Sequence, residues 1–152
     1  MVIPGRAPTP GFLVWRLSMK WRAAVDRAVA PLGLTHGQYS VLASLQGMSE
    51  AGLHPSQREL ADHTGLEPLH VSKVVRALEQ AGLVERVANP ADARAVLLAP
   101  TKRGAKVALE AITIVGALLD QLTAPLGGRR GKQTRALTDA LQTLLAVPNP
   151  EP

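Results

Sequence analysis

The sequence predicts a mainly α fold of the α+β class, with several helices and one small β-hairpin. Along most of the chain, apolar residues recur every three or four positions, as they do on one face of a helix. In one stretch, residues 83–99, two apolar runs flank a polar segment, which is typical of two strands joined by a turn. The chain has 152 residues, 46% of them hydrophobic, so it can bury one core but has no room for a second large domain.

The first predicted helix runs from Gly11 to about Ala30. Pro31 and Gly33 follow it, and both residue types end helices. Charged residues fall between the apolar positions, so this helix is amphipathic. The apolar positions are Val14, Leu17, Trp21, Val25 and Ala28.

A second helix is expected to begin after Thr35. Thr35 and Gln38 have the spacing of a capping box, in which each side chain accepts a hydrogen bond from a free backbone N–H at the helix start. We expect this helix to end at Gly47 and a loop to run from Met48 to Pro55. The apolar positions of the helix are Tyr39, Leu42 and Leu45.

Two further helices are predicted in direct succession. Ser56 and Glu59 form a second capping box, which opens a short helix that reaches Gly65. Pro68 then stands where the first residue of a helix belongs, and this helix runs to Gly82. Its apolar stripe consists of Val71, Val74, Val75 and Leu78. The pair is a helix-turn-helix candidate.

Residues 83–87 and 95–99 are predicted to be the strands of the hairpin, and residues 89–94 its polar tip. Thr101 is expected to cap a long helix, which Pro125, Gly127 and Gly128 end. The near-heptad stripe of this helix suits helix–helix packing and consists of Ala108, Ile112, Val115, Leu119 and Leu122. A last helix before Pro148 carries Leu137, Leu141, Leu144 and Leu145.

The order of the predicted elements is that of a winged helix-turn-helix with a small β-hairpin wing and N- and C-terminal dimerisation helices. The longer helix of the pair fits the major groove of DNA, where side chains opposite its apolar stripe can contact base edges. Those side chains are Pro68, His70, Ser72, Lys73 and Arg76. An ordinary solvated helix face is the alternative.

The sequence resembles the MarR-type (multiple antibiotic resistance regulator) winged-helix repressors from about Gly11 to Val147. The resemblance is most specific in the run from Val71 to Arg86, in Asp92-Ala93-Arg94, and in the segment Thr101 to Gly104. It implies a homodimer that binds a palindromic DNA site, with Arg94 in the minor groove and Asp92 holding the wing. The DNA-binding residues expected on this basis are Arg58, Pro68, His70, Ser72, Lys73, Arg76, Arg86, Asp92 and Arg94.

Three residues depart from the family pattern. Glu67 stands at the N-cap before Pro68, where serine or threonine is usual; it caps poorly, repels nearby phosphates and is a candidate specificity element. Ala93 replaces a second basic residue of the wing, so phosphate contacts are fewer. Pro100 replaces a common leucine and affects the packing before the long helix.

The resemblance also implies a small anionic or phenolic effector bound between the dimerisation helices and the winged lobe. An arginine beside aromatic groups can hold a carboxylate in an apolar cleft. The residues expected to bind it are Trp15, Arg16, Met19, His36 and Tyr39. Trp15 and Tyr39 have core or interface packing as the alternative role.

For domain organisation we expect a flexible arm at 1–10, a single MarR-like domain at 11–147 and a disordered tail at 148–152. Within the domain, the winged helix-turn-helix occupies about 35–100 and the dimerisation helices about 11–30 and 101–147. The apolar faces of those terminal helices exceed what the winged core can cover, which also predicts a dimer, with an intramolecular bundle as the alternative.

Composition narrows the functional class. The net charge of +5 favours an anionic partner such as nucleic acid, and the absence of cysteine excludes disulfides and thiolate metal sites, as is typical of cytoplasmic proteins. The longest apolar run, Ala111 to Leu119, is too short to span a membrane. The four histidines lack metal-site spacing, and no catalytic motif is present, so we expect no enzyme activity, metal or cofactor. A winged-helix dimerisation or protein-interaction module that does not bind DNA is the alternative function.

Overall fold

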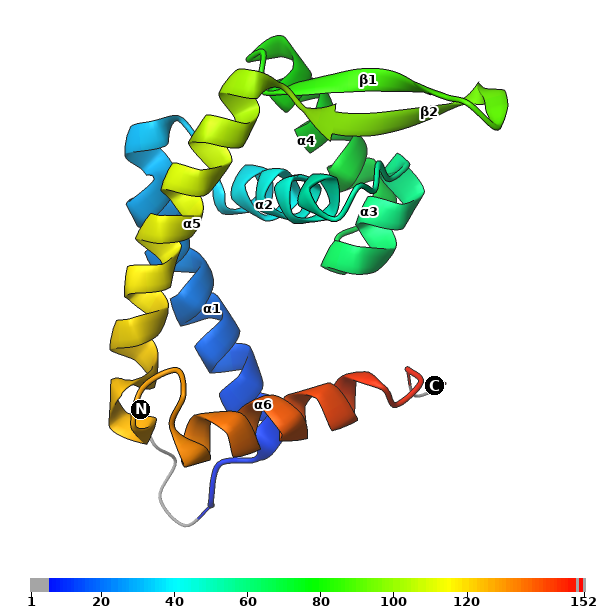
Figure 1. Ribbon diagram of the computed structural model, residues 1–152. Coiled ribbons are helices and arrows are strands. Elements are labelled where there is room, and N and C mark those ends of the chain that lie inside the picture. Colours follow the sequence, from blue (N-terminus) through cyan, green and yellow to red (C-terminus); the bar gives the residue numbers. More distant parts are fainter. Residues whose placement is uncertain (1–5, 150, 152) are drawn as a thin grey trace. The chain divides into compact units, whose positions relative to one another are not determined.

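The computed structural model describes residues 6–149 and 151. The chain divides into two compact units, Met1–Ile114 and Val115–Pro152. Parts of the predicted arm and tail fall on residues 1–5, 150 and 152, which lie outside the described residues. The elements in order are α1 (Pro10–Val29), η1 (Ala30–Leu32), α2 (His36–Glu50), α3 (Gln57–Thr64), α4 (Pro68–Gln80), β1 (Val84–Asn89), β2 (Asp92–Pro100), α5 (Lys102–Thr123), η2 (Ala124–Leu126) and α6 (Lys132–Leu145) (Figure 1). The predicted mainly α fold with one antiparallel hairpin is confirmed.

Side-chain caps fix the starts of the first three helices. The hydroxyl of Thr9 accepts a hydrogen bond from the Phe12 N–H, so α1 begins one residue earlier than predicted. Both predicted capping boxes are present, at Thr35 for α2 and at Ser56 for α3. Local sequence is sufficient here because a cap bonds only residues within the first turn.

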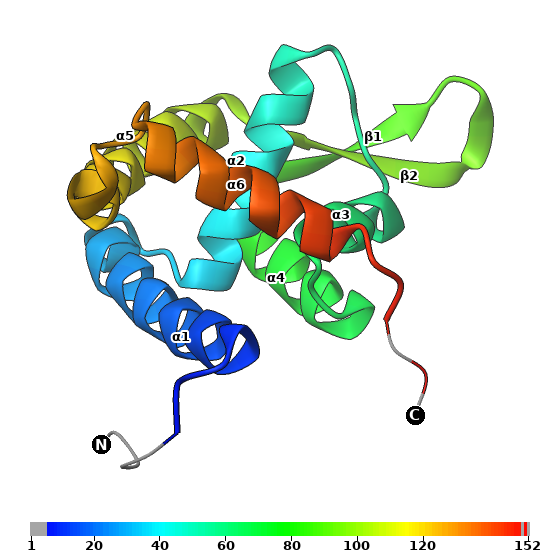
Figure 2. The same ribbon diagram turned by 90° about the horizontal axis from the view of Figure 1, so that it is seen from below.

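Helices α2, α3 and α4 pack on one another and form the core of the first unit (Figure 2). All four residues of the predicted α4 stripe are buried. The largest fully buried side chains come from α1, α2, α3, α4 and β2, and include Leu42, Leu45, Leu60, Leu78 and Leu98. The core therefore supports α4 on one side and leaves its other side exposed.

The prediction that α2 ends at Gly47 is wrong, because the helix continues to Glu50. A glycine inside a helix costs about 1 kcal/mol relative to alanine. Burial of Leu45 and a hydrogen bond of 2.9 Å from Gln46 Nε2 to Glu50 Oε1 extend across this position and favour continuation. The chain turns instead at Gly52, where φ is 76°.

The strands of the hairpin are longer than predicted. Asp92 to Arg94, assigned to the tip, belong to β2, and Asn89 belongs to β1. The hairpin projects from the helices (Figure 1), so most of its side chains meet water on both faces, and backbone pairing rather than apolar alternation sets its length. Pro55 also binds the hairpin, since its carbonyl accepts a 2.8 Å hydrogen bond from the Leu98 N–H.

The start of α5 is bonded to the chain between α4 and β1. The Thr101 hydroxyl donates to the carbonyl of Gly82 at 2.7 Å and accepts from the Gly104 N–H at 3.0 Å, which confirms Thr101 as the cap of the long helix. The Thr101 N–H donates to the Leu83 carbonyl at 3.0 Å, and Arg103 Nη2 donates to the Ala81 carbonyl at 2.8 Å. These bonds fix where α5 leaves the winged part.

The predicted apolar stripe of α5 is only partly covered. Ala108 and Val115 are buried, whereas Ile112 is 39% exposed. The segment Lys102–Leu126 is long and apolar enough, by length and composition alone, to cross a membrane, with a mean hydropathy of 1.5. The longest uninterrupted run of apolar residues therefore understated the apolar character of this helix.

The second unit contains the end of α5, η2 and α6. Gly127, with φ at 85°, lies directly after η2, in the region where the sequence predicted a stop. Arg129 forms an ion pair with Asp120, with 2.6 Å between Nε and Oδ1. The predicted leucines of α6 are exposed, with exposed fractions of 42% for Leu137, 36% for Leu141, 59% for Leu144 and 84% for Leu145. One side of α6 thus presents an uncovered apolar surface in the single chain.

Candidate nucleic-acid interface

The exposed side of α4 carries polar and cationic side chains. Lys73 and Arg76 are exposed and Ser72 is half-buried. Arg76 Nη2 donates a hydrogen bond of 3.3 Å to the Ser72 hydroxyl. These residues lie opposite the buried stripe that begins with Val71, so the core orients them outward.

Glu67 and Pro68 form the start of α4. Pro68 is the first helical residue, as predicted, and Glu67 is the N-cap residue without a side-chain capping bond. Because the Glu67 carboxylate does not accept a bond from the helix, the first backbone N–H groups of α4 lack a side-chain partner. An exposed carboxylate therefore stands beside free donors that attract anions.

His70 differs in position from the other predicted residues of α4. A Cβ at Gly37 of α2 would lie 3.0 Å from His70 Nε2 and 3.6 Å from Val74 Cγ2. The imidazole ring therefore lies against α2, at the side of α4 rather than at the centre of its exposed face.

Two hydrogen bonds from backbone N–H groups to side-chain oxygens shape the hairpin tip. Asp92 Oδ1 accepts a hydrogen bond of 3.0 Å from the Arg94 N–H, and Asn89 Oδ1 accepts one of 2.9 Å from the Ala91 N–H. The first bond ties the Asp92 side chain to the backbone of Arg94. The sequence reasoning missed Asn89, although Asn followed by Pro is a recognised turn signal. Arg94 is exposed beside these bonds.

The remaining two predicted arginines differ in their surroundings. Arg58 is exposed on α3. Arg86 on β1 forms an ion pair with Glu79 of α4, with 3.0 Å between Nε and Oε2. The hydrogen bonds and charge of Glu79 raise the pKa of Arg86 above its ordinary value. Sequence reasoning did not identify Glu79 as a partner, because the pair joins a helix to a strand seven residues away.

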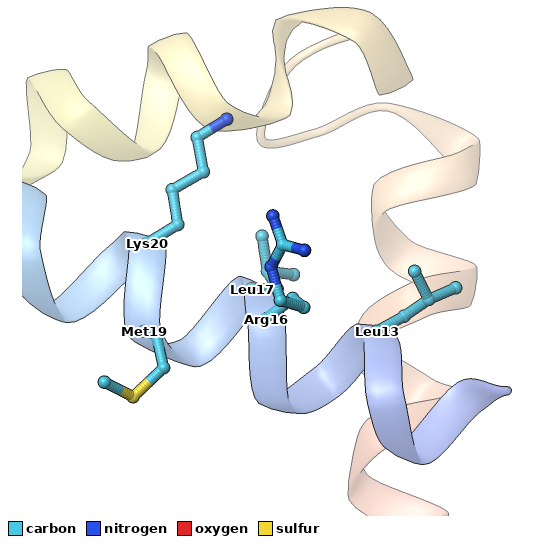
Figure 3. A pocket seen from close by; sticks show the side chains of 5 residues that line it. All are labelled: Leu13, Arg16, Leu17, Met19 and Lys20. Atoms are coloured by element: carbon cyan, nitrogen blue, oxygen red, sulfur yellow. The ribbon is translucent and has the colours of Figure 1, made fainter. Parts of the chain in front are cut away.

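A shallow hollow of about 560 Å³ lies along α1. Figure 3 shows Leu13, Arg16, Leu17 and Lys20 on one side of the helix and Met19 extending from the other. The Arg16 guanidinium carbon lies 5.9 Å from the centre of the Phe12 ring, which is within the range of a cation–π contact. Two of the predicted effector residues, Arg16 and Met19, therefore border this hollow, whereas Trp15 is 62% exposed on the same helix.

His36 and Tyr39, the other predicted effector residues, lie at the start of α2. The His36 N–H donates a hydrogen bond of 2.6 Å to Asp26 Oδ1 of α1. About 15 Å of helix axis separates Asp26 from Arg16, so one chain does not bring all five predicted residues together. Burial lowers the pKa of His36, opposed by the charge of Asp26, and burial raises the pKa of Tyr39.

Comparisons with known proteins agree with this order of elements. A model of the MarR family matches residues 34–96, which hold α2 to most of the hairpin. The HTH-type transcriptional regulator YdcH of Bacillus subtilis, itself uncharacterised, is 39% identical over 111 residues, covering 73% of this chain and 76% of that protein. The chain belongs to the MarR family. It is accordingly a winged-helix transcriptional regulator of the HTH type, as predicted from the run Val71 to Arg86.

Two other MarR relatives have informative partners. The HTH-type transcriptional repressor Rv2887 of Mycobacterium tuberculosis is 36% identical over 119 residues, covering 76% of this chain and 83% of that protein. Its structure in complex with salicylic acid matches with a TM-score of 0.69 at 31% identity, over 93% of this chain and 99% of that one. A mutant MarR of E. coli complexed with operator DNA has a TM-score of 0.73 at 25% identity, over 90% and 93% of the two chains.

Proposed function

We propose that this MarR family member is a ligand-responsive repressor that binds a palindromic operator as a homodimer. One observation carries the proposal: α4 exposes Lys73 and Arg76 on the side opposite the core, and the projecting hairpin exposes Arg94. A helix and a neighbouring guanidinium so placed match the major groove and the adjoining minor groove of one half-site.

The proposed DNA contacts divide into two kinds. Ser72, Lys73 and Arg76 contact base edges and phosphates in the major groove. Arg94 enters the minor groove, where a narrow groove concentrates negative potential, and Asp92 fixes the backbone that carries it. Glu79 competes with phosphate for Arg86. The complete proposed set is Arg58, Pro68, His70, Ser72, Lys73, Arg76, Arg86, Asp92 and Arg94.

The homodimer is supported by the apolar surface that the single chain leaves uncovered. Phe12, Leu13 and Trp15 at the start of α1 are each at least 50% exposed, and α6 exposes its leucines as described. A second copy that covers these faces also explains why α5 is apolar enough to resemble a membrane helix. Two copies related by a twofold axis place their α4 helices in successive major grooves, with half-sites about 10 bp apart.

The proposed effector is a small anionic or phenolic molecule, and the complex of the relative Rv2887 with salicylic acid supports this class. Arg16 supplies a cation beside the Phe12 ring, which suits a carboxylate on an aromatic body. Trp15 and Met19 extend this part, while His36 and Tyr39 form a second part near Asp26. The effector releases the operator by altering the spacing of the two winged lobes.

The remaining properties follow from the proposed role. The protein works in the cytoplasm, without catalytic activity and without a cofactor, as a single MarR-like domain over residues 11–147. Within the described residues, no group of three or more His, Asp or Glu side chains is placed to hold a metal ion.

The test of DNA binding uses duplexes selected from genomic fragments that the purified protein retains. We expect affinity to fall as salt rises, and Arg94→Ala and Arg76→Ala each to weaken binding at least about fivefold, consistent with about 1–3 kcal/mol for a good base contact. Arg130→Ala, which removes an exposed arginine outside the interface, is the matched control and should bind normally. A salt slope near zero, or full binding by both interface variants, would contradict the proposal and favour a module that binds protein instead of DNA.

A further inference from the structure

Leu69 is the most exposed large apolar side chain of the winged part, at 80%. It lies in the first turn of α4, between Pro68 and His70. Leu69 is also not part of the hydrophobic staple of this helix, in which the residue before the N-cap packs on the fourth helical residue. Those two residues are Leu66 and the buried Val71. The fold therefore gives Leu69 no packing role.

The position of Leu69 around the helix is its informative feature. Successive residues of an α-helix are about 100° apart, so Leu69 falls almost directly opposite the centre of the buried stripe of α4. Leu69, Ser72, Lys73 and Arg76 follow the spacing i, i+3, i+4 and i+7, which places them on one exposed face. His70 lies about a quarter turn from this centre and rests against Gly37.

The chemistry of this face identifies the group that an apolar side chain would meet there. Among the base edges of the major groove, only the C5-methyl group of thymine is apolar. Lys73 and Arg76, one and two turns further along α4, supply the attraction to phosphates and base acceptors that holds the helix in the groove. A leucine beside them gains affinity by removing a methyl group from water together with its own exposed surface.

We propose that Leu69 is a specificity-determining residue that contacts the methyl group of one thymine in each operator half-site. The proposal rests on the proposed function, because it requires α4 to occupy the major groove. It places Leu69, rather than His70, at the centre of the face of α4 that contacts bases.

The test removes only the C5-methyl group of thymine from the DNA. In a duplex that the protein binds, each thymine in turn is replaced by deoxyuridine, and dissociation constants are measured for the wild-type protein and for Leu69→Ala. We expect one replacement per half-site to weaken wild-type binding about fourfold, the effect of burying one methyl group. Leu69→Ala should bind the thymine and deoxyuridine duplexes equally at that position.

One variant controls for indirect effects. Leu53→Ala removes a leucine that is 60% exposed outside α4, and it should keep the wild-type dependence on the methyl group. The melting temperature of Leu69→Ala should equal that of the wild type, because the side chain is exposed.

The outcomes separate this inference from the proposed function. If the protein binds duplexes with the expected salt dependence but no thymine replacement matters, or Leu69→Ala remains sensitive to the methyl group, the role of Leu69 is overturned and DNA binding stands. The role is also overturned if Leu69→Ala weakens all duplexes equally, as expected for a contact with the sugar backbone or with protein. Failure to bind any duplex overturns both proposals.

Discussion

Gly104 is the residue where the packing of α5 leaves no room for a side chain. A Cβ at this position would lie 1.8 Å from the carbonyl oxygen of Leu83 and 2.8 Å from its carbonyl carbon. The obstacle is backbone that is itself bonded to Thr101, so it cannot rotate away as a side chain does. The family pattern of Thr101 to Gly104 thus has a direct steric cause.

For Gly104→Ala we expect a loss of about 3 kcal/mol in the free energy of unfolding, at the upper end of the usual cost of overpacking. Chemical denaturation checks it. Gly47→Ala is the control, because Gly47 is inside α2 and a Cβ there meets nothing within 4 Å, and it should stabilise the protein by about 0.5–1 kcal/mol. A Gly104→Ala variant as stable as the wild type would refute the close contact.

His36 should make stability depend on pH. Burial lowers its pKa below the ordinary value of 6.5, so between the two pKa values the unfolded chain binds more protons than the folded one. This stability contribution is complete above pH 6.5 and is lost as the pH falls toward the lowered pKa. In denaturation curves between pH 7.5 and 5, we expect His36→Gln to lose less stability on acidification than the wild type, with His54→Gln as the exposed control. Parallel curves for all three proteins would contradict the prediction.

At the scale of elements, the starts of the helices were predictable, whereas the end of α2 and the length of the hairpin were not. Thr35, Ser56 and Pro68 mark starts through contacts within one turn, which a short stretch of sequence contains in full. The end of α2 depends on the burial of Leu45, and the length of the hairpin depends on backbone pairing between its two strands. The apolar pattern of the sequence records neither, and both predictions were wrong for that reason.

Glu67 gives α4 the weakest start among the helices that carry the predicted interface. Glu67→Ser should supply the missing side-chain acceptor and raise the free energy of unfolding by about 1 kcal/mol. It also removes a negative charge that faces the proposed phosphates, so DNA affinity should rise at low salt. Ser56→Ala, which deletes the working cap of α3, should lose a similar amount of stability. Unchanged melting of Glu67→Ser would show that water already satisfies the start of α4.

At the scale of the whole molecule, we expect the exposed leucines of α6 to form part of the dimer interface. Leu141 and Leu144 lie on the same side of the helix, and both are exposed in the single chain. Replacing both with glutamate should convert the proposed dimer to monomers, because two charges per chain would be buried without partners. Sedimentation equilibrium measures this, and Asp139→Asn on the opposite side of α6 should leave the dimer intact. A monomeric wild-type protein would remove the basis of the palindromic site.

The sequence by itself determined the order of elements, the capping boxes, the buried stripe of α4 and the family, because each depends on residues close together in the chain. Only the tertiary structure decided that His70 rests on Gly37, that Glu79 pairs with Arg86, and that Leu69 faces outward without a packing partner. These features depend on how each helix packs against its neighbours. Periodicity shows which side of a helix is apolar, but packing decides what each remaining side chain contacts.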